Sequence, residues 1–353
     1  MSVVALDPFG AGSDPQMPVL TGALDPAVVE RCLRPCLPGL LAVGAIRVVR
    51  YKPGRRCLIE YDVEMARPER AAEALTLVAK VRPRGADMHT FRLMQALWHR
   101  GFDAESRDGI SVPAPVAAVP ELGLWLQRKV QGTSATALLL ERSGVELAAR
   151  LGEAVHKLHT AGVPTRRRHT LADELRILQE RLGAVARARP EWAARVERLL
   201  RACERVSARL SGQRRCGIHR DFYADHAVLD GQRVYLLDFD LYCEGDAAVD
   251  VGNCIAHITE HSLRTCGHPL ALADREAALE ERFVELAGPG ARAAVLVYAL
   301  LTLARHISLS TQFAERRPFT TALLELCEER LDLSSGGRAA TATRLSPRAG
   351  ANA

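Results

Sequence analysis

Lysine is scarce in this 353-residue sequence, which has only Lys52, Lys80, Lys129 and Lys157 among its 47 lysines and arginines. A lysine is therefore less expected as surface filler here than in an ordinary chain. Aromatic residues are also few, at 5%, and the net charge is only +5. Nucleic-acid interfaces cluster basic residues and interleave them with aromatics. The composition therefore predicts that nucleic acid is not a partner.

The sequence also lacks the patterns of a secreted, zinc-binding or membrane-spanning protein. Its nine cysteines are scattered, and the closest pair, Cys32 and Cys36, belongs to no paired Cys-x-x-Cys motif. This spacing predicts neither a disulfide framework nor a structural zinc site, and reduced cysteines indicate the cytoplasm. The N-terminus lacks the basic and apolar regions of a signal peptide. The longest apolar run, 293–304, is too short to span a bilayer, so it predicts a buried helix and no membrane partner.

Strand patterns dominate the first part of the chain after residue 41. Two β-rich runs flank a Pro-Gly turn between Lys52 and Arg56, which predicts a hairpin. The predicted strands are 45–51, 57–64, 75–81, 116–119 and 122–127, with a helix predicted at 87–100. These elements predict a small antiparallel sheet with one inserted helix.

After Gly132 the pattern becomes mostly helical, with two short strands predicted at 227–229 and 234–237. We therefore predict an α+β chain in two lobes. Its parts are an N-terminal arm and helix at 1–41, a small β-rich lobe at 42–130, a large helical lobe at 131–333 and a disordered tail at 334–353. Ligand clefts favour the junction between such lobes.

The residues most suggestive of chemistry lie between 217 and 253. Phosphoryl transfer requires a carboxylate to orient the attacking hydroxyl and oxygen ligands to hold metal on the phosphates. Asp221 ends a His-Arg-Asp triplet in a predicted loop, and Asp238 follows the apolar run 234–237. Nine acidic residues and one arginine lie between 221 and 260, which suits a divalent metal or a cationic acceptor.

Structural roles explain some of these acidic residues equally well. Asp230 precedes Gly231 in a predicted turn, Asp225 is a second turn candidate, and Asp246 is placed to cap the next helix. A purely structural account of both Asp221 and Asp238 would require a coincidence of two motifs. We therefore favour the chemical interpretation for this pair.

The segment resembles the aminoglycoside phosphotransferase and choline kinase superfamily, whose members share the protein-kinase-like fold. The family pattern is H-x-D-x-x-x-x-N, an apolar strand ending in I-D-[FW], and then G-D-P-x-x-D. The matching residues here are His219, Asp221, Asp238, Asp246 and Asp250. The resemblance implies that Asp221 is the catalytic base and Asp238 a metal ligand. It also implies that His219 braces the catalytic loop and that Asp250, with Asp246 nearby, supports the site from a helix.

The resemblance extends more weakly to the small lobe and implies ATP as a cofactor. Lys80 lies in an apolar strand and would pair the phosphates, whereas the alternative is a lysine on the solvent face. Lys52 and Arg55 lie in the turn that would cover the phosphates, although a basic turn is often merely solvated. Gln127 and Lys129 would belong to the connector that faces the adenine.

Two positions depart from the family pattern. His226 occupies the place of the metal-binding asparagine, and imidazole is a poor ligand for Mg²⁺. It would contact a phosphate, bind Mn²⁺ or leave one metal weakly held. The helix at 87–100 contains no glutamate to pair Lys80, and Asp87 is a candidate only if that helix begins early. Both departures leave open a pseudokinase.

The leading hypothesis is an enzyme that uses ATP and Mg²⁺ to phosphorylate a hydroxyl of an amino sugar, sugar, amino alcohol or polyol. The alternative is a nucleotide-binding pseudokinase that regulates a partner. A protein kinase is less favoured because no Asp-Phe-Gly or long activation loop follows Asp238. We interpret His156 and His159 as packing residues, and His257 and His261 as either structural or cleft-lining.

Overall fold

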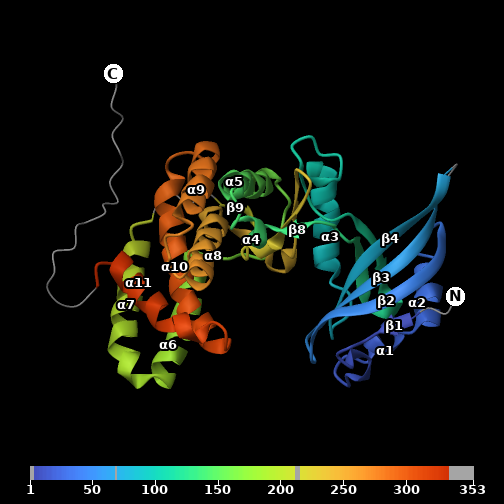
Figure 1. Cartoon of the computed structure of the whole chain (residues 1–353), viewed down its shortest axis with the longest axis horizontal. Helices are drawn as coiled ribbons and strands as arrows, with labels where there is room; N and C mark the ends of the chain where they lie inside the picture. Colours follow the sequence, from blue (N-terminus) through green and yellow to red (C-terminus); the bar gives the residue numbers. More distant parts are fainter. Residues whose placement is uncertain (1–3, 68–69, 211–214, 334–353) are drawn as a thin grey trace.

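Two lobes lie side by side in the computed structural model, which describes residues 4–67, 70–210 and 215–333 (Figure 1). A twisted sheet forms one lobe and a group of helices forms the other. The α+β organisation expected from the sequence is therefore confirmed. The tail at 334–353, predicted to be disordered, lies outside the described residues.

The small lobe contains one six-stranded sheet in the order β1-β2-β3-β4-β7-β6. Its strands are β1 (Val4–Leu6), β2 (Leu40–Lys52), β3 (Arg56–Arg67), β4 (Arg70–Val81), β6 (Pro115–Val119) and β7 (Leu124–Arg128). The predicted strands are present, but β2, β3 and β4 extend beyond the predicted ranges. Irregular register between β2 and β3 explains part of this difference, because bulges interrupt the simple alternation that marks a strand in sequence.

The described part of the predicted N-terminal arm is built into this sheet lobe. β1 pairs in parallel with β2, and two helices follow it, α1 (Val19–Ala23) and α2 (Pro26–Leu33). Leu20 and Leu33 are fully buried, in the same core as Ile46 and Tyr61. Local patterns could not show this, because the partner of β1 lies far along the chain. The lobe therefore begins well before the predicted boundary at residue 42.

Helix α3 (Met88–Leu97) continues through a π-helical turn at Trp98–Phe102 and packs beside the sheet lobe. Asp87 is its N-cap, and the side chain accepts a hydrogen bond from the backbone N–H of Thr90 at 3.0 Å. The predicted helix is thus confirmed, with Asp87 just outside it.

The large lobe is assembled around α8 and α10. Its helices are α4 (Ala135–Leu138), α5 (Gly144–Thr160), α6 (Leu171–Ala188), α7 (Ala193–Ser207), α8 (Ala248–Cys266), α9 (Ala273–Ala287), α10 (Ala291–Gln312) and α11 (Thr320–Arg330). The contact between α8 and α10 is close, since a Cβ on Gly252 would lie 2.6 Å from the backbone nitrogen of Ala299. In the described part of the chain, α10 alone is long and apolar enough to cross a membrane, yet most of its apolar window is buried in the lobe. The predicted buried helix at 293–304 is therefore confirmed.

Two small sheets frame the segment that was singled out for chemistry. β5 (Ile110–Ser111), β11 (Arg233–Leu236), β10 (Ala227–Asp230) and β8 (Thr133–Ser134) form one, and β9 (Arg215–Ile218) with β12 (Cys243–Asp246) forms the other. The β10–β11 hairpin was predicted, whereas β9 and β12 were missed because each contains a glycine and few apolar residues, which gives no strand pattern. Strand β9 ends immediately before His219, so pairing with β12 holds the start of the loop in place.

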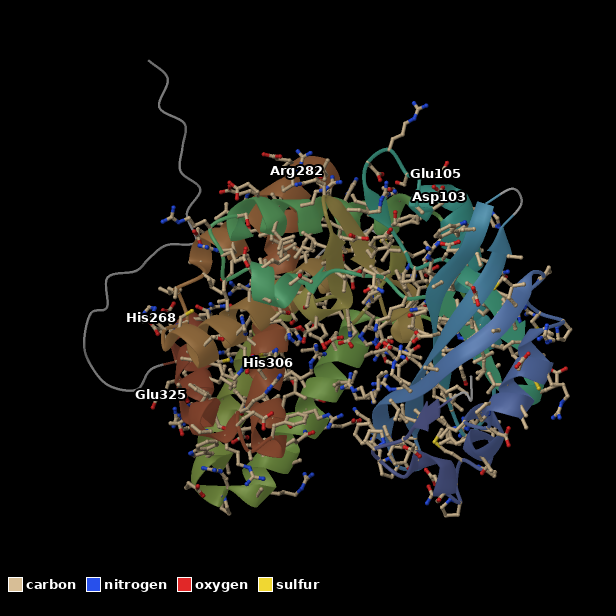
Figure 2. All side chains as sticks on the ribbon, turned by 45° about the vertical axis from the view of Figure 1, so that its right-hand side comes forward. Asp103, Glu105, His268, Arg282, His306 and Glu325 are labelled. Carbon is tan, nitrogen blue, oxygen red and sulfur yellow. The ribbon has the colours of Figure 1, made fainter. Side chains whose placement is uncertain are left out.

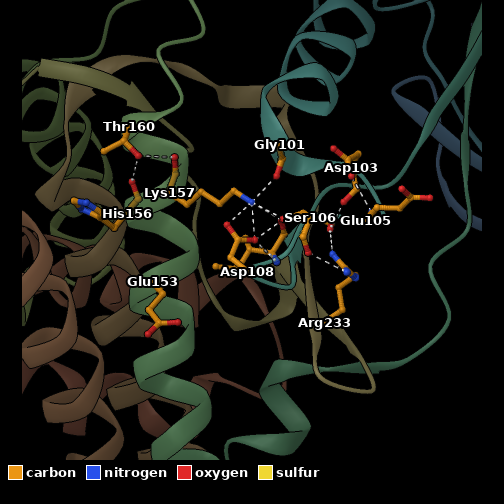
Figure 3. A network of polar contacts seen from close by, with 12 residues as sticks. Gly101, Asp103, Glu105, Ser106, Asp108, Glu153, His156, Lys157, Thr160 and Arg233 are labelled. Atoms are coloured by element: carbon orange, nitrogen blue, oxygen red, sulfur yellow. Dashed lines mark hydrogen bonds and ion pairs between the residues drawn. The ribbon is translucent and has the colours of Figure 1, made fainter.

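A polar network around Lys157 fastens α5 to the segment that follows α3 (Figure 3). The ammonium nitrogen of Lys157 lies 2.8 Å from a carboxylate oxygen of Asp108 and 2.9 Å from the hydroxyl of Ser106. It also donates to the carbonyl oxygens of Gly101 and Ile110, at 2.5 and 2.8 Å. Lys157, for which the sequence indicated no role, is therefore structural.

The buried carboxyl of Glu276 on α9 should make stability depend on pH. Burial raises the pKa of Glu276 from an ordinary 4.5 to about 7, and the Thr259 hydroxyl lies 2.6 Å from one of its oxygens. The folded chain therefore holds this proton more tightly than the unfolded chain does. Its stabilising effect is complete below pH 4.5 and is lost as pH rises to 7, by up to about 3 kcal/mol.

Glu276→Gln keeps a neutral side chain of the same shape at every pH, and its amide oxygen can still accept the hydrogen bond that the Thr259 hydroxyl donates. We expect the variant and the native chain to melt at similar temperatures at pH 5. At pH 8 the variant should melt several degrees higher. Thermal unfolding from pH 5 to 8 measures this difference, with exposed Glu281→Gln as the control. A constant difference across that range would contradict the assignment.

Candidate active site

A cleft of about 510 Å³ lies between the two lobes. Side chains from β3 and β4, including Leu58, Val78 and Lys80, line it from the small lobe. Tyr223, His226, Leu237 and Asp238 line it from the large lobe. Five of the residues predicted for the site therefore line one cleft, namely Lys80, Gln127, Lys129, His226 and Asp238.

Asp221 lies in the loop between β9 and β10, with 43% of its side chain exposed. The backbone before it is strained, because Arg220 has a φ of 70° in the left-handed region. The buried carboxylate of Asp250 accepts hydrogen bonds from the backbone N–H groups of His219 and Arg220, at 2.8 and 2.6 Å. These bonds hold the loop in the conformation that presents Asp221 at the surface.

Asp250 itself is fully buried in the first turn of α8. One of its oxygens lies 2.8 Å from Nε2 of His159, whose ring packs edge-on against Phe283. His156 also contacts the ring of Phe283, so both histidines pack as the sequence predicted, and His159 in addition bonds to Asp250. The structure places Asp250 where the predicted role requires it, behind the loop and on a helix.

His219 is fully buried under the same loop. Burial lowers the pKa of His219, so the ring is neutral, and its Nε2–H donates to the backbone oxygen of Leu237 at 2.7 Å. The ring thereby links the Asp221 loop to the residue before Asp238. The structure thus gives His219 the bracing position that the family resemblance implied.

Asp238 follows β11 with a φ of 59°, a left-handed conformation that turns its carboxylate toward the cleft. Its Oδ1 lies 2.8 Å from the ammonium nitrogen of Lys80. Burial alone would raise the pKa of Asp238, but the adjacent Lys80 outweighs it and holds the pKa well below its usual range. Asp238 is therefore an anion at neutral pH, as a metal ligand must be.

Lys80 points into the cleft and not to the solvent face of β4. Its ammonium also lies 2.7 Å from Oδ2 of Asp240, so two carboxylates share it. Asp87 pairs with Arg82 and not with Lys80: its carboxylate lies 3.5 Å from a guanidinium nitrogen of Arg82. The acidic partner sought on α3 is supplied instead by the segment after β11.

At the turn between β2 and β3, Arg56 lines the cleft, whereas the two residues predicted there, Lys52 and Arg55, do not. A guanidinium nitrogen of Arg56 lies 3.7 Å from Oδ2 of Asp238, whereas Arg55 is exposed at the turn and does not line the cleft. Burial lowers the pKa of Lys52, as does the positive charge of Arg56. Register could have identified Arg56, because Leu58 pairs with Lys80 and alternate residues of β3 face the same way.

The N-terminal segment fastens this turn from behind. Asp14 accepts hydrogen bonds from the backbone N–H of Gly54 and the hydroxyl of Tyr51, each at 2.7 Å. Gly54 has a φ of 62°, and a Cβ there would lie 2.0 Å from the side-chain oxygen of Gln16. A glycine is therefore required at the tip, and residues before the predicted lobe hold it.

Gln127 and Lys129, in the connector between the lobes, line the cleft as predicted. The ammonium of Lys129 lies 2.6 Å from Oε1 of Glu60, a buried residue of β3 that also lies 3.3 Å from Arg47. The sequence did not indicate Glu60. Its position opposite Val78 on the cleft face could have been inferred only with the β3–β4 register in hand.

His226 lies between the two aspartates. Its Nδ1 lies 2.7 Å from the backbone oxygen of Asp221, so this nitrogen carries a hydrogen and donates it. In the neutral ring, Nε2 then presents its lone pair toward Oδ2 of Asp238, 3.8 Å away. A carboxylate and an imidazole nitrogen thus face the same space.

This donor set suits a metal only with help from a ligand. Among the described residues, no group of three or more His, Cys, Asp or Glu side chains is arranged to hold a metal ion. Asp238 and His226 would therefore need phosphate oxygens and water to complete the coordination. An imidazole in the set favours Mn²⁺ relative to Mg²⁺.

The acidic run between 221 and 260 is not gathered at the cleft. Glu244 lies 3.2 Å from Arg168, and Glu260 lies 3.3 Å from Arg264. The Asp246 side chain accepts a hydrogen bond from the N–H of Ala248 at the start of α8, at 3.0 Å. The number of acidic residues in this run therefore overstated the negative charge at the cleft. These three acids give no support to a cationic acceptor.

His257 and His261 of α8, which the sequence left as either structural or cleft-lining, differ in role. The ring of His257 stacks on Tyr223, a cleft residue, at 4.1 Å, and contacts the buried ring of His306 at 4.4 Å. Figure 2 labels His306 among the helices of the large lobe. His257 therefore supports the cleft floor from behind. Nδ1 of His261 lies 3.2 Å from both Arg264 and Thr265, so His261 is structural.

Comparisons with known proteins agree with this architecture. The sequence matches the model of the phosphotransferase enzyme family over residues 31–288. Comparison with curated proteins finds no match.

Two solved structures show the same fold as this chain. Spectinomycin phosphotransferase in complex with ADP and spectinomycin has a TM-score of 0.56 at 10% identity, covering 87% of this chain and 98% of that chain. A thermostable mutant of aminoglycoside phosphotransferase APH(4)-Ia, in a ternary complex with AMP-PNP and hygromycin B, has a TM-score of 0.54 at 13% identity, covering 88% and 99%. The predicted two-lobed, kinase-like fold is confirmed.

Proposed function

The chain belongs to the phosphotransferase enzyme family and is a small-molecule kinase, and we propose that it transfers the γ-phosphoryl group of ATP to a hydroxyl of its acceptor. One observation carries this proposal. Asp221 and Asp238 both approach His226, a residue that lines the cleft, at 3.9 and 3.8 Å, and Lys80 faces Asp238 from the opposite lobe. The proposal includes the cytoplasmic setting predicted from the sequence.

Each side chain has a role that follows from its place. The apolar residues Leu58, Val78 and Leu237 would enclose the base, since they line the cleft. Lys80 and Arg56 would bind the phosphates, because both are cations beside Asp238. Complexes of two fold neighbours with ADP and AMP-PNP support a nucleotide in this cleft.

Asp221 would act as the general base. Its partly exposed carboxylate has no ion pair to Lys or Arg among the described residues, so an oxygen is free to accept the proton of an acceptor hydroxyl. Asp238 and His226 would hold the divalent metal, which when bound neutralises charge on the phosphates. The acceptor hydroxyl would then lie between Asp221 and the γ-phosphoryl group.

A second candidate, a nucleotide-binding pseudokinase, is favoured by one specific feature. Lys80 has no partner on α3 and is held between two carboxylates of the large lobe. A lysine held in this way could bind nucleotide without orienting it for transfer.

A substrate panel separates the two candidates. Aminoglycosides, other amino sugars, sugars, amino alcohols and polyols would each be tested for consumption of ATP and of GTP, with Mg²⁺ and Mn²⁺ compared. We expect turnover with at least one acceptor class, and activity with Mn²⁺ equal to or above that with Mg²⁺. A thermal shift with ATP but no turnover in any combination would instead support the pseudokinase. No nucleotide binding at all would contradict both.

A further inference from the structure

Kinase-fold phosphotransferases need an acidic residue to orient the lysine that binds the phosphates, and it normally comes from the helix beside the sheet. Helix α3 of this chain contains no glutamate or aspartate. The nearest acid, Asp87, caps α3 and pairs with Arg82. The lysine must therefore be oriented from somewhere else, or not at all.

Asp240 supplies a partner of suitable geometry. It lies in the 3-10 turn Phe239–Leu241, two residues after Asp238, and its Oδ2 lies 2.7 Å from the ammonium of Lys80. Its side chain is only 18% exposed, as is that of Lys80, so the pair is shielded from solvent. Partial burial strengthens the interaction relative to a surface pair.

Asp240 is also fixed from both sides. Arg82 pairs with the same oxygen, and it reaches Asp87 at the start of α3, 3.5 Å away. A guanidinium nitrogen of Arg167, from the loop after α5, donates to the backbone oxygen of Asp240 at 2.7 Å. Helix α3 thus still contacts the lysine, but indirectly, through Arg82 and Asp240.

We propose that Asp240 is the positioning residue for Lys80 and replaces the missing helix glutamate. This inference rests on the proposed function, because it assigns Lys80 to the phosphates. Asp238 cannot hold Lys80 throughout, since a carboxylate that binds metal has less negative charge to share with the ammonium. Asp240 keeps Lys80 at the phosphate end of the cleft when Asp238 turns to the metal.

Asp240 is less suited than Asp238 to bind the metal itself. Lys80 and Arg82 both occupy its Oδ2, and Arg56 lies 3.9 Å from the same oxygen. Three cations around one carboxylate oxygen would repel a divalent ion. This crowding separates the task of Asp240 from that of Asp238.

The test measures binding of ADP and of adenosine by calorimetry, both without metal and with Mg²⁺. Asp240→Asn should weaken ADP binding by about tenfold, as expected for loss of a charge-assisted contact, while adenosine binding stays within twofold. Asp240→Glu should recover part of the loss, because it keeps the charge. The control is Glu244→Gln, which removes an Arg-paired acid of the same segment outside the cleft.

A double-mutant cycle then shows whether Asp240 acts through Lys80. In a Lys80→Met background, Asp240→Asn should change ADP affinity by less than twofold. Additive losses would overturn the inference, as would equal losses for ADP and adenosine. Failure of the native protein to bind ADP would instead overturn the proposed function.

Discussion

Asp221→Asn should lower kcat by about 10³-fold while ADP affinity stays within twofold of the native value. The amide keeps the size of the carboxylate but cannot accept the hydroxyl proton. The substitution should leave the loop intact, because His226 donates to the backbone oxygen of Asp221 and not to its side chain. Lys80 is also untouched, since its partners are Asp238 and Asp240.

Steady-state kinetics on the acceptor found in the panel, together with calorimetry for ADP, checks this expectation. Asp230→Asn is the matched control, because Asp230 lies in the same segment but is exposed beside the turn between β10 and β11. A kcat within tenfold of the native value in Asp221→Asn would contradict the role of Asp221 as base.

Asp250→Ala should have the largest effect on folding. The carboxylate is fully buried and bonds to His159 and to the N–H groups of His219 and Arg220. Its removal leaves two buried N–H groups without acceptors, which should cost about 3 kcal/mol or more. The melting temperature should fall by about 10 °C, and kcat should fall as well, because the loop loses the bonds that hold Arg220 in its strained conformation.

Asp246→Ala provides the comparison, because Asp246 is also mostly buried yet accepts one backbone hydrogen bond, from Ala248. We expect it to destabilise the chain by about 1 kcal/mol. If Asp250→Ala does not fold, Asp250→Asn should fold and still melt below Asp246→Ala, since the amide turns a donor toward a backbone N–H. Equal melting temperatures for the Asp250 and Asp246 variants would contradict the central role of Asp250.

The floor of the site was predictable because its parts are close in the chain. Only the short β10–β11 hairpin separates the Asp221 loop from Asp238, so local strand patterns already placed the two carboxylates on one side. The apolar run around Lys80 likewise predicted a strand lysine. The catalytic and metal-binding roles of these residues stay predictions, and the experiments above test them.

Other features depend on pairings that no local pattern contains. Strand β1 pairs with β2 across a segment that contains α1 and α2, and Asp14 holds Gly54 from forty residues away. Asp240 was passed over because its importance comes from Lys80, which lies 160 residues earlier. Charge counts along the chain also misled, since an acid such as Glu244 is paired with Arg168 outside the cleft.

The small number of lysines has a practical consequence for chemical labelling. Lys80 and Lys129 line the cleft, Lys52 lies in the turn above it, and Lys157 is enclosed by its network. Acylating reagents that usually modify many surface lysines would here react mainly with the α-amino group, exposed Lys52 and the cleft lysines. Protection of Lys80 and Lys129 by nucleotide would therefore report occupancy of the cleft.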